Sequence, residues 1–98
     1  MEKATLIALE KAGLTLKDVD WIIPHQANLR IIASLIRRLG FPEDRVVVNL
    51  DRVANTSTAS IPIALDEAIR SGLIEPGQIV VMTGFGAGVT YGAAVIKI

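Results

Sequence analysis

Three short segments of the sequence contain side chains and backbone suited to chemistry. His25 is the only histidine, Asn55 precedes a threonine and a serine, and residues 84–88 read Gly-Phe-Gly-Ala-Gly. A neutral histidine and an asparagine can each donate a hydrogen bond, and glycines let a backbone N–H come close to a substrate. This combination suits the stabilisation of a developing oxyanion or enolate better than hydrolysis or metal chemistry.

Each of these segments also has a purely structural interpretation. His25 stands where a predicted strand passes to a helix N-terminus, which favours a neutral ring, but a helix-capping histidine fits the same place. Asn55 before Thr56 and Ser57 is ordinary turn or N-cap chemistry. The glycines at 84–88 equally suit a tight hairpin, and they fail the dinucleotide-binding fingerprint because a strand follows them. The residues alone leave both interpretations open.

A basic face is predicted on the helix that follows His25. Arg30, Arg37 and Arg38 share this face because they are seven and eight residues apart. A solvated helix face is the simple interpretation. The alternative is a docking patch for an acidic partner, which electrostatic steering would help to bring in.

Composition excludes several classes of function for these 98 residues. The absence of cysteine excludes disulfides, thiolate zinc sites and a cysteine nucleophile within the chain, and a single histidine excludes a multi-histidine metal site. Ten basic and ten acidic side chains give no net charge, so a broad cationic field for nucleic acid or anionic lipid is absent. No metal site is expected.

The charge pattern argues against a targeting or membrane segment. The apolar run after Lys3 is interrupted by Glu10 and Lys11, which is too soon for a signal peptide, and a cytoplasmic location follows as the expectation. Residues 76–96 lack charge and approach the length of a membrane span. Their glycines, however, would weaken a helix, and short buried strands around a Gly-rich turn are the better interpretation.

Hydrophobic periodicity and turn residues predict a layered α/β domain with a mostly parallel sheet and a final antiparallel strand. The predicted elements are a helix over 4–12, a capped turn over 15–18, strands over 19–24, 46–50, 79–83 and 90–98, and helices over 31–39 and 61–69. In such sheets, sites gather at the carboxyl ends of the strands. The topology therefore brings residues 24–28, 53–57 and 84–88 to one edge.

The motifs of these three segments resemble one known family. They are Pro24-His25-Gln26-Ala27-Asn28-Leu29-Arg30, Asn55-Thr56-Ser57-Thr58-Ala59-Ser60 and Gly84-Phe85-Gly86-Ala87-Gly88. In this order and spacing they are similar to the C-terminal part of 3-oxoacyl-acyl-carrier-protein synthase III, the initiating condensing enzyme of bacterial type II fatty acid synthesis. The resemblance covers essentially the whole chain.

The resemblance implies a thiolase-like fold and a Cys-His-Asn triad. Residues 1–98 would form the C-terminal half, and the nucleophilic cysteine would belong to an N-terminal half that this chain lacks. His25 and Asn55 would hydrogen-bond the malonyl thioester carbonyl while carbon dioxide leaves, with Gln26 and Asn28 in supporting roles. The chain alone is expected to be inactive.

Further site residues and partners follow from the same resemblance. Backbone N–H groups of Gly86, Ala87 and Gly88 would contribute to the oxyanion hole, and Arg30 would dock acyl carrier protein together with Arg37 and Arg38. The substrates would be an acyl-CoA primer and malonyl-acyl-carrier protein, with no cofactor. The full-length enzyme would be a homodimer, with no nucleic acid or membrane as a partner.

Two departures from the family pattern are visible. Ala54 stands where family members usually have glycine before the asparagine, and the first central strand of this half is expected to be missing. Two other functions remain open. One is a non-catalytic module for carrier-protein docking or dimerisation, and the other is a related secondary-metabolite ketosynthase or acyltransferase.

Overall fold

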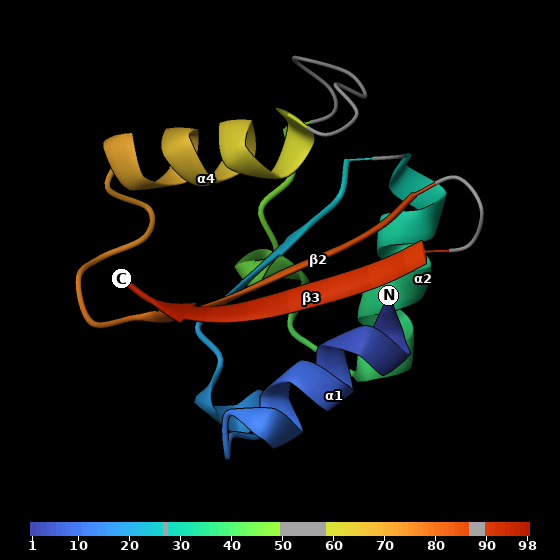
Figure 1. The fold of residues 1–98 in the computed structure, drawn as a ribbon. Coiled ribbons are helices and arrows are strands. Elements are labelled where there is room, and N and C mark those ends of the chain that lie inside the picture. Colours follow the sequence, from blue (N-terminus) through green and yellow to red (C-terminus); the bar gives the residue numbers. More distant parts are fainter. Residues whose placement is uncertain (27, 50–58, 87–89) are drawn as a thin grey trace.

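The computed structural model describes residues 1–26, 28–49, 59–86 and 90–98. Its order of elements matches the predicted alternation of helices and strands, apart from one strand (Figure 1). The elements are α1 (Glu2–Lys11), a 3-10 turn (Leu16–Asp18), β1 (Trp21–Pro24), α2 (Leu29–Leu39), a second 3-10 turn (Glu43–Arg45), α4 (Ser60–Arg70), β2 (Ile79–Gly86) and β3 (Thr90–Lys97). The segment that approached the length of a membrane span forms most of β2 and β3. No helix among the described residues is long and apolar enough to cross a bilayer.

The sheet has the order β1-β2-β3. β1 runs parallel to β2 with Trp21 opposite Val80, and β2 runs antiparallel to β3 with Ile79 opposite Lys97. The predicted final antiparallel strand is therefore confirmed. β1, β2 and β3 are direct neighbours, so the expected missing strand has no central place among them. A further strand could pair with this sheet only at an edge.

The predicted strand over 46–50 is the main error at the level of elements. Its only ladder contact among the described residues is a single parallel bridge between Val46 and Ile22, and Leu50 lies outside those residues. In the next hydrogen bond of a parallel ladder, the residue at position 24 would donate its backbone N–H to the carbonyl of Val47. Position 24 is a proline, which has no backbone N–H. A β-branched sequence is thus present, but its partner strand cannot continue the ladder.

β2 is longer than predicted because its pairing with β3 continues through the Gly-rich segment. Gly84 is opposite Gly92, Phe85 is opposite Tyr91, and Gly86 is opposite Thr90. The first three residues of the turn expected over 84–88 therefore belong to the strand, and the other two lie outside the described residues.

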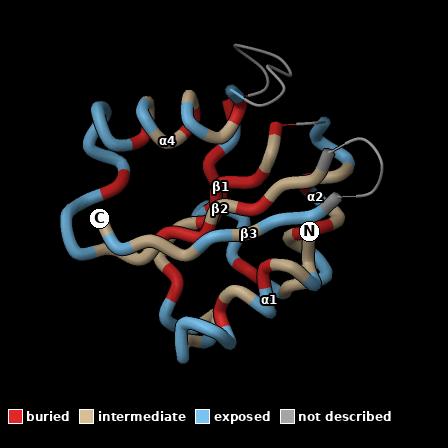
Figure 2. The backbone as a smooth tube through the Cα atoms, in the orientation of Figure 1, coloured by how far each residue is buried: buried red, intermediate tan, exposed pale blue. Residues whose placement is uncertain are grey.

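Helices cover both faces of the sheet, as Figure 1 shows with α4 on one side and α1 and α2 on the other. Consecutive residues of the central strands face opposite layers: Ile22 and Val81 pack with α1 and α2, whereas Ile23 and Val80 pack with α4. Buried residues accordingly gather along β1 and β2, while the outer helix faces are exposed (Figure 2). Strands buried on both faces are typical of parallel α/β sheets and explain the continuous apolar runs in the sequence.

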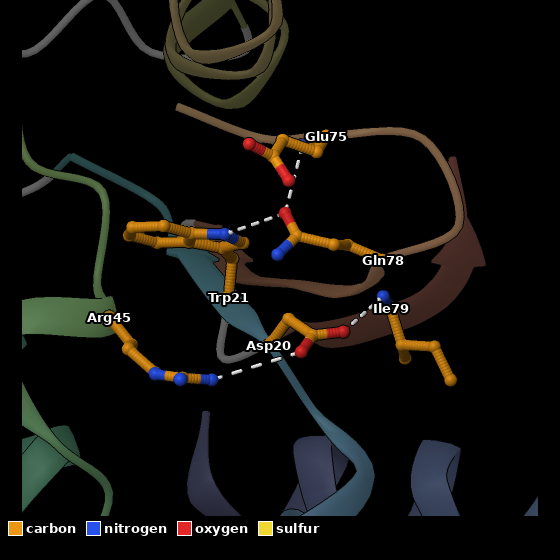
Figure 3. Close-up of polar contacts among 6 residues, drawn as sticks. All are labelled: Asp20, Trp21, Arg45, Glu75, Gln78 and Ile79. Atoms are coloured by element: carbon orange, nitrogen blue, oxygen red, sulfur yellow. Dashed lines mark hydrogen bonds and ion pairs between the residues drawn. The ribbon is translucent and has the colours of Figure 1, made fainter. Parts of the chain in front are cut away.

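A polar cluster fixes the register of β1 and β2 at their amino ends (Figure 3). The Nε1 of Trp21 donates to Oε1 of Gln78 at 3.1 Å, across the two strand starts. One carboxylate oxygen of Asp20 accepts the backbone N–H of Ile79 at 2.8 Å, and the other lies 3.8 Å from Arg45. Because this register is fixed at one end, it also determines which residues of β2 lie beside His25 at the other.

Candidate active site

His25 lies at the carboxyl edge of the sheet, immediately after β1. Its backbone N–H donates to the carbonyl of Thr83 in β2 at 2.8 Å, so the chain stays attached to β2 one residue beyond the strand. The side chain is partly buried. The predicted placement of the only histidine beside the Gly-rich segment is therefore confirmed.

The imidazole of His25 contacts two other elements. Nδ1 lies 2.6 Å from the hydroxyl oxygen of Ser60, the first residue of α4. The ring also meets the Phe85 ring edge-on, with centroids 5.6 Å apart and planes at 83°. Such an edge-to-face arrangement is the preferred geometry of aromatic pairs. These contacts fix the ring plane from β2 and α4 at once.

Gly84 provides the room in which the His25 side chain packs. A Cβ atom at Gly84 would lie 3.4 Å from the Cβ of His25 and 3.4 Å from Cδ1 of Ile61. A distance of 3.4 Å is ordinary van der Waals contact, so an added methyl group would just reach both neighbours. The residue at position 84 thus lies directly against the His25 side chain, and no positive φ requires a glycine there.

Gln26 connects the end of β1 to the segment that replaces the predicted second strand. Its side chain is fully buried; Nε2 donates to the carbonyls of Pro24 at 2.8 Å and Val47 at 3.2 Å, and Oε1 accepts the N–H of Asn49 at 3.0 Å. The side-chain amide thus takes the place of a peptide group in the ladder that Pro24 interrupts. It satisfies three buried backbone groups that would otherwise lack partners.

Asn28 performs a different supporting task. Its Oδ1 accepts the backbone N–H of Ile31 at 3.0 Å, which makes it the N-cap of α2, and Gly40 ends this helix with φ of 67°. The predicted end of this helix at residue 39 is confirmed. This cap, three residues after His25, fixes the start of α2 at Leu29.

Several predicted site residues lie outside the described residues. These are Asn55 with its neighbour Ala54, and Ala87 and Gly88 of the oxyanion segment. Both flanks of the asparagine segment are nevertheless attached to the histidine segment, because Asn49 bonds Gln26 and Ser60 bonds His25. Gly86 is described and ends β2 opposite Thr90. The roles of Asn55 and of the oxyanion glycines stay predictions.

Ser60 is a residue of this site for which the sequence suggested no role of its own. A serine at the start of a helix suggests a cap, yet the described start of α4 has no side-chain cap bond, and the Ser60 hydroxyl contacts His25 instead. Nothing in the spacing shows this, because the two residues are 35 positions apart and come from different elements. The only available signal was the predicted convergence of segments at one sheet edge.

The three arginines of α2 are exposed. Within the part of the chain that the structure describes, Arg30, Arg37 and Arg38 form no ion pair, in contrast to Arg70, which pairs with Asp66 at 2.8 Å. The described residues contain no group of three acidic, histidine or cysteine side chains that could hold a metal ion. The positive charges of α2 are therefore not neutralised by described neighbours.

Comparison with known proteins gives a family and several close relatives. Residues 9–98 match the family model described as 3-oxoacyl-[acyl-carrier-protein] synthase III C terminal. The chain is 59% identical over 97 residues to a beta-ketoacyl-[acyl-carrier-protein] synthase III of Desulfitobacterium hafniense, covering 99% of this chain and 29% of that protein. It is 54% identical over 90 residues to a chloroplastic synthase III of Arabidopsis thaliana, covering 92% of this chain and 22% of that protein.

Solved structures give the same picture. The beta-ketoacyl-[acyl carrier protein] synthase III of Thermus thermophilus superimposes with a TM-score of 0.96 at 56% identity, covering all of this chain and 30% of that one. The priming beta-ketosynthase of the R1128 polyketide pathway superimposes with a TM-score of 0.87 at 46% identity, covering 99% of this chain and 29% of that one. The chain thus spans 22% to 29% of the length of the two curated synthases named above.

Proposed function

The chain belongs to the family of 3-oxoacyl-[acyl-carrier-protein] synthase III C-terminal domains, and from this premise we propose that it supplies the histidine and asparagine of an initiating condensing enzyme. The proposed reaction joins malonyl-acyl-carrier protein to an acyl-CoA primer and yields a 3-oxoacyl-acyl-carrier protein. It is a decarboxylative Claisen condensation. The two substrates supply every atom, so no cofactor is required.

The proposed chemistry begins with loss of carbon dioxide from the malonyl group. The electrons of the breaking C–C bond move toward the thioester carbonyl and form an enolate, whose oxygen accepts hydrogen bonds from His25 and Asn55. The α-carbon of the enolate then attacks the carbonyl carbon of an acyl-enzyme thioester, and the thiolate leaves. This chain has no cysteine, so that thiolate comes from the region that relatives have and this sequence does not include.

One observation carries this proposal: the His25 ring is fixed at the carboxyl edge by contacts from β2 and α4. Only Nδ1 of the ring is engaged by described residues, which leaves Nε2 to meet a substrate. A group that stabilises charge must be held before the charge develops, because reorganisation during the reaction would cancel the benefit. The serine and phenylalanine contacts supply that rigidity.

We propose acyl carrier protein as the macromolecular partner, docked on the arginine face of α2. Arg30 lies in the second position of the helix that starts beside the site, so a carrier bound there would have its acyl chain near His25. Homodimerisation and a cytoplasmic location belong to the same proposal. The chloroplastic relative shows that location differs among close relatives.

A hybrid enzyme tests this function. In it, the chain replaces the matching part of the Desulfitobacterium hafniense synthase, with which it is 59% identical. We expect the hybrid to form 3-oxoacyl-acyl-carrier protein, the His25→Ala hybrid to lose this activity, and the 98-residue chain alone to form none. A hybrid that folds and becomes acylated by the primer but forms no condensation product would refute the proposal.

A related ketosynthase of secondary metabolism is the second candidate function, and the likeness to the R1128 priming ketosynthase favours it. Both candidates use the same histidine and asparagine, and they differ in the acyl groups they accept. Turnover with primers of increasing length in the polypeptide that carries this sequence distinguishes them. If the chain were a non-catalytic docking module instead, His25→Ala would change neither carrier-protein binding nor the formation of condensation product.

A further inference from the structure

The contact between Ser60 and His25 determines more than the position of the ring. The Ser60 hydroxyl is buried, with 1% of the residue exposed, and lies 2.6 Å from Nδ1 of His25. The same oxygen accepts the backbone N–H of Gln26 at 3.4 Å. Ser60 thus meets the histidine segment at two consecutive residues.

Counting hydrogens assigns the direction of the short bond. A hydroxyl has one hydrogen to donate and two lone pairs to accept with. If Nδ1 carried the ring proton, Ser60 would accept from both Nδ1 and the Gln26 N–H, and its own hydrogen would have no partner among the described residues. A buried donor without a partner is costly, whereas the opposite direction satisfies the Ser60 hydroxyl, Nδ1 of His25 and the Gln26 N–H together.

We infer that Ser60 donates its hydroxyl hydrogen to Nδ1 and thereby holds His25 in the tautomer that carries the proton on Nε2. Ser60 is then a positioning residue: it acts through His25 and touches no substrate. In a neutral imidazole one nitrogen donates and the other accepts, so an accepting Nδ1 makes Nε2 the donor. This inference rests on the proposed function, which needs a donor at Nε2 for the enolate oxygen.

The tautomer can be read directly by NMR because His25 is the only histidine of the chain. With ¹⁵N-labelled histidine, we expect Nδ1 to show the shift of an unprotonated ring nitrogen and Nε2 that of a protonated one. If the chain folds only together with the remaining region, the same measurement is made in the hybrid enzyme. There, the His25 signals are identified as those that disappear in His25→Ala. A proton on Nδ1 in the folded protein would overturn the inference.

Two variants in the hybrid enzyme test the consequence for activity. Ser60→Ala should lower kcat for malonyl decarboxylation roughly three- to tenfold, the worth of one neutral hydrogen bond, with KM within about twofold. Ser60→Thr keeps the hydroxyl and should restore most of the rate. In Ser60→Ala the two ring nitrogens should also move toward each other in shift as the tautomers mix.

The controls separate this inference from the function on which it rests. Decarboxylation that survives His25→Ala would refute the function, whatever Ser60 does. If His25→Ala removes the activity while Ser60→Ala keeps the parental rate and nitrogen shifts, the function stands and the inference fails. If Ser60→Ala does not fold, the His25 tautomer measured in the unsubstituted protein still decides whether the inference holds.

Discussion

Oε1 of Gln26 accepts the backbone N–H of Asn49 at 3.0 Å, which ties the segment after β1 to the segment that leads toward Asn55. The same side chain bonds the carbonyls of Pro24 and Val47. One buried amide therefore holds the flanks of the two proposed catalytic segments at a fixed separation. A glutamine is suited to this because its amide has a donor and an acceptor in the plane of a peptide group.

Replacing Gln26 should destabilise the protein more than its size suggests. Gln26→Ala leaves two carbonyls and one N–H without their partner in a fully buried site, and we expect the unfolding free energy to fall by about 2 kcal/mol or more. Gln26→Glu keeps the shape and the acceptor but loses both donated bonds, so it should also destabilise. Thermal unfolding of the hybrid enzyme measures this, and unchanged midpoints for both variants would contradict the role.

Gly84 and Gly92 form a matched pair because they are opposite each other in β2 and β3. A Cβ at Gly84 meets His25 and Ile61, whereas a Cβ at Gly92 meets nothing within 4 Å. Gly84→Val carries methyl groups beyond a Cβ that is already in contact with His25, so it should displace the histidine and lower the decarboxylation rate roughly three- to tenfold, since small misplacements of a reacting group are costly. Gly92→Val should leave the rate unchanged. Equal effects of the two substitutions on this rate would show that Gly84 does not set the position of His25.

Two aspartates should differ in their contribution to stability. Asp20 accepts the N–H of Ile79 between β1 and β2, whereas the partner of Asp66 among the described residues is Arg70, on the exposed surface of α4. We expect Asp20→Ala to cost about 1–2 kcal/mol of unfolding free energy and Asp66→Ala less than about 0.5. Asp20→Asn retains an acceptor and should fall between them. Denaturant unfolding gives the values, and a cost at Asp66 as large as that at Asp20 would argue against the strand register depending on Asp20.

Removing the charges of the arginine face of α2 should change the KM only of the substrate that is attached to the carrier protein. Changing Arg30, Arg37 and Arg38 together to alanine should raise KM for malonyl-acyl-carrier protein about tenfold and reduce its salt dependence. KM for malonyl-CoA should not change. Arg70→Ala on α4 serves as the control for loss of an exposed charge. A parallel rise in KM for both substrates would place the effect in the active site instead of a docking surface.

Sequence reasoning found most of this fold because local signals and burial agree. The helix stop at Gly40 and the antiparallel return of β3 follow from turn chemistry and connection length. The prediction of a strand over 46–50 was wrong because β-branched residues favour a strand but do not indicate which strand would pair with it. The neighbouring strand ends in Pro24, which cannot donate the next hydrogen bond of the ladder. The role of Ser60 was missed for a similar reason, since a contact across 35 residues depends on how β1 and α4 pack.

Malonyl-thioester decarboxylation without a primer tests the central claim most directly, because it isolates formation of the enolate. In the hybrid enzyme, His25→Ala and Asn55→Ala should each lower its rate about 10²- to 10³-fold, the usual effect of removing one donor to an oxyanion. Binding of malonyl-acyl-carrier protein should persist in both variants. Decarboxylation at the parental rate in either folded variant would contradict the enolate-stabilising role assigned to that residue.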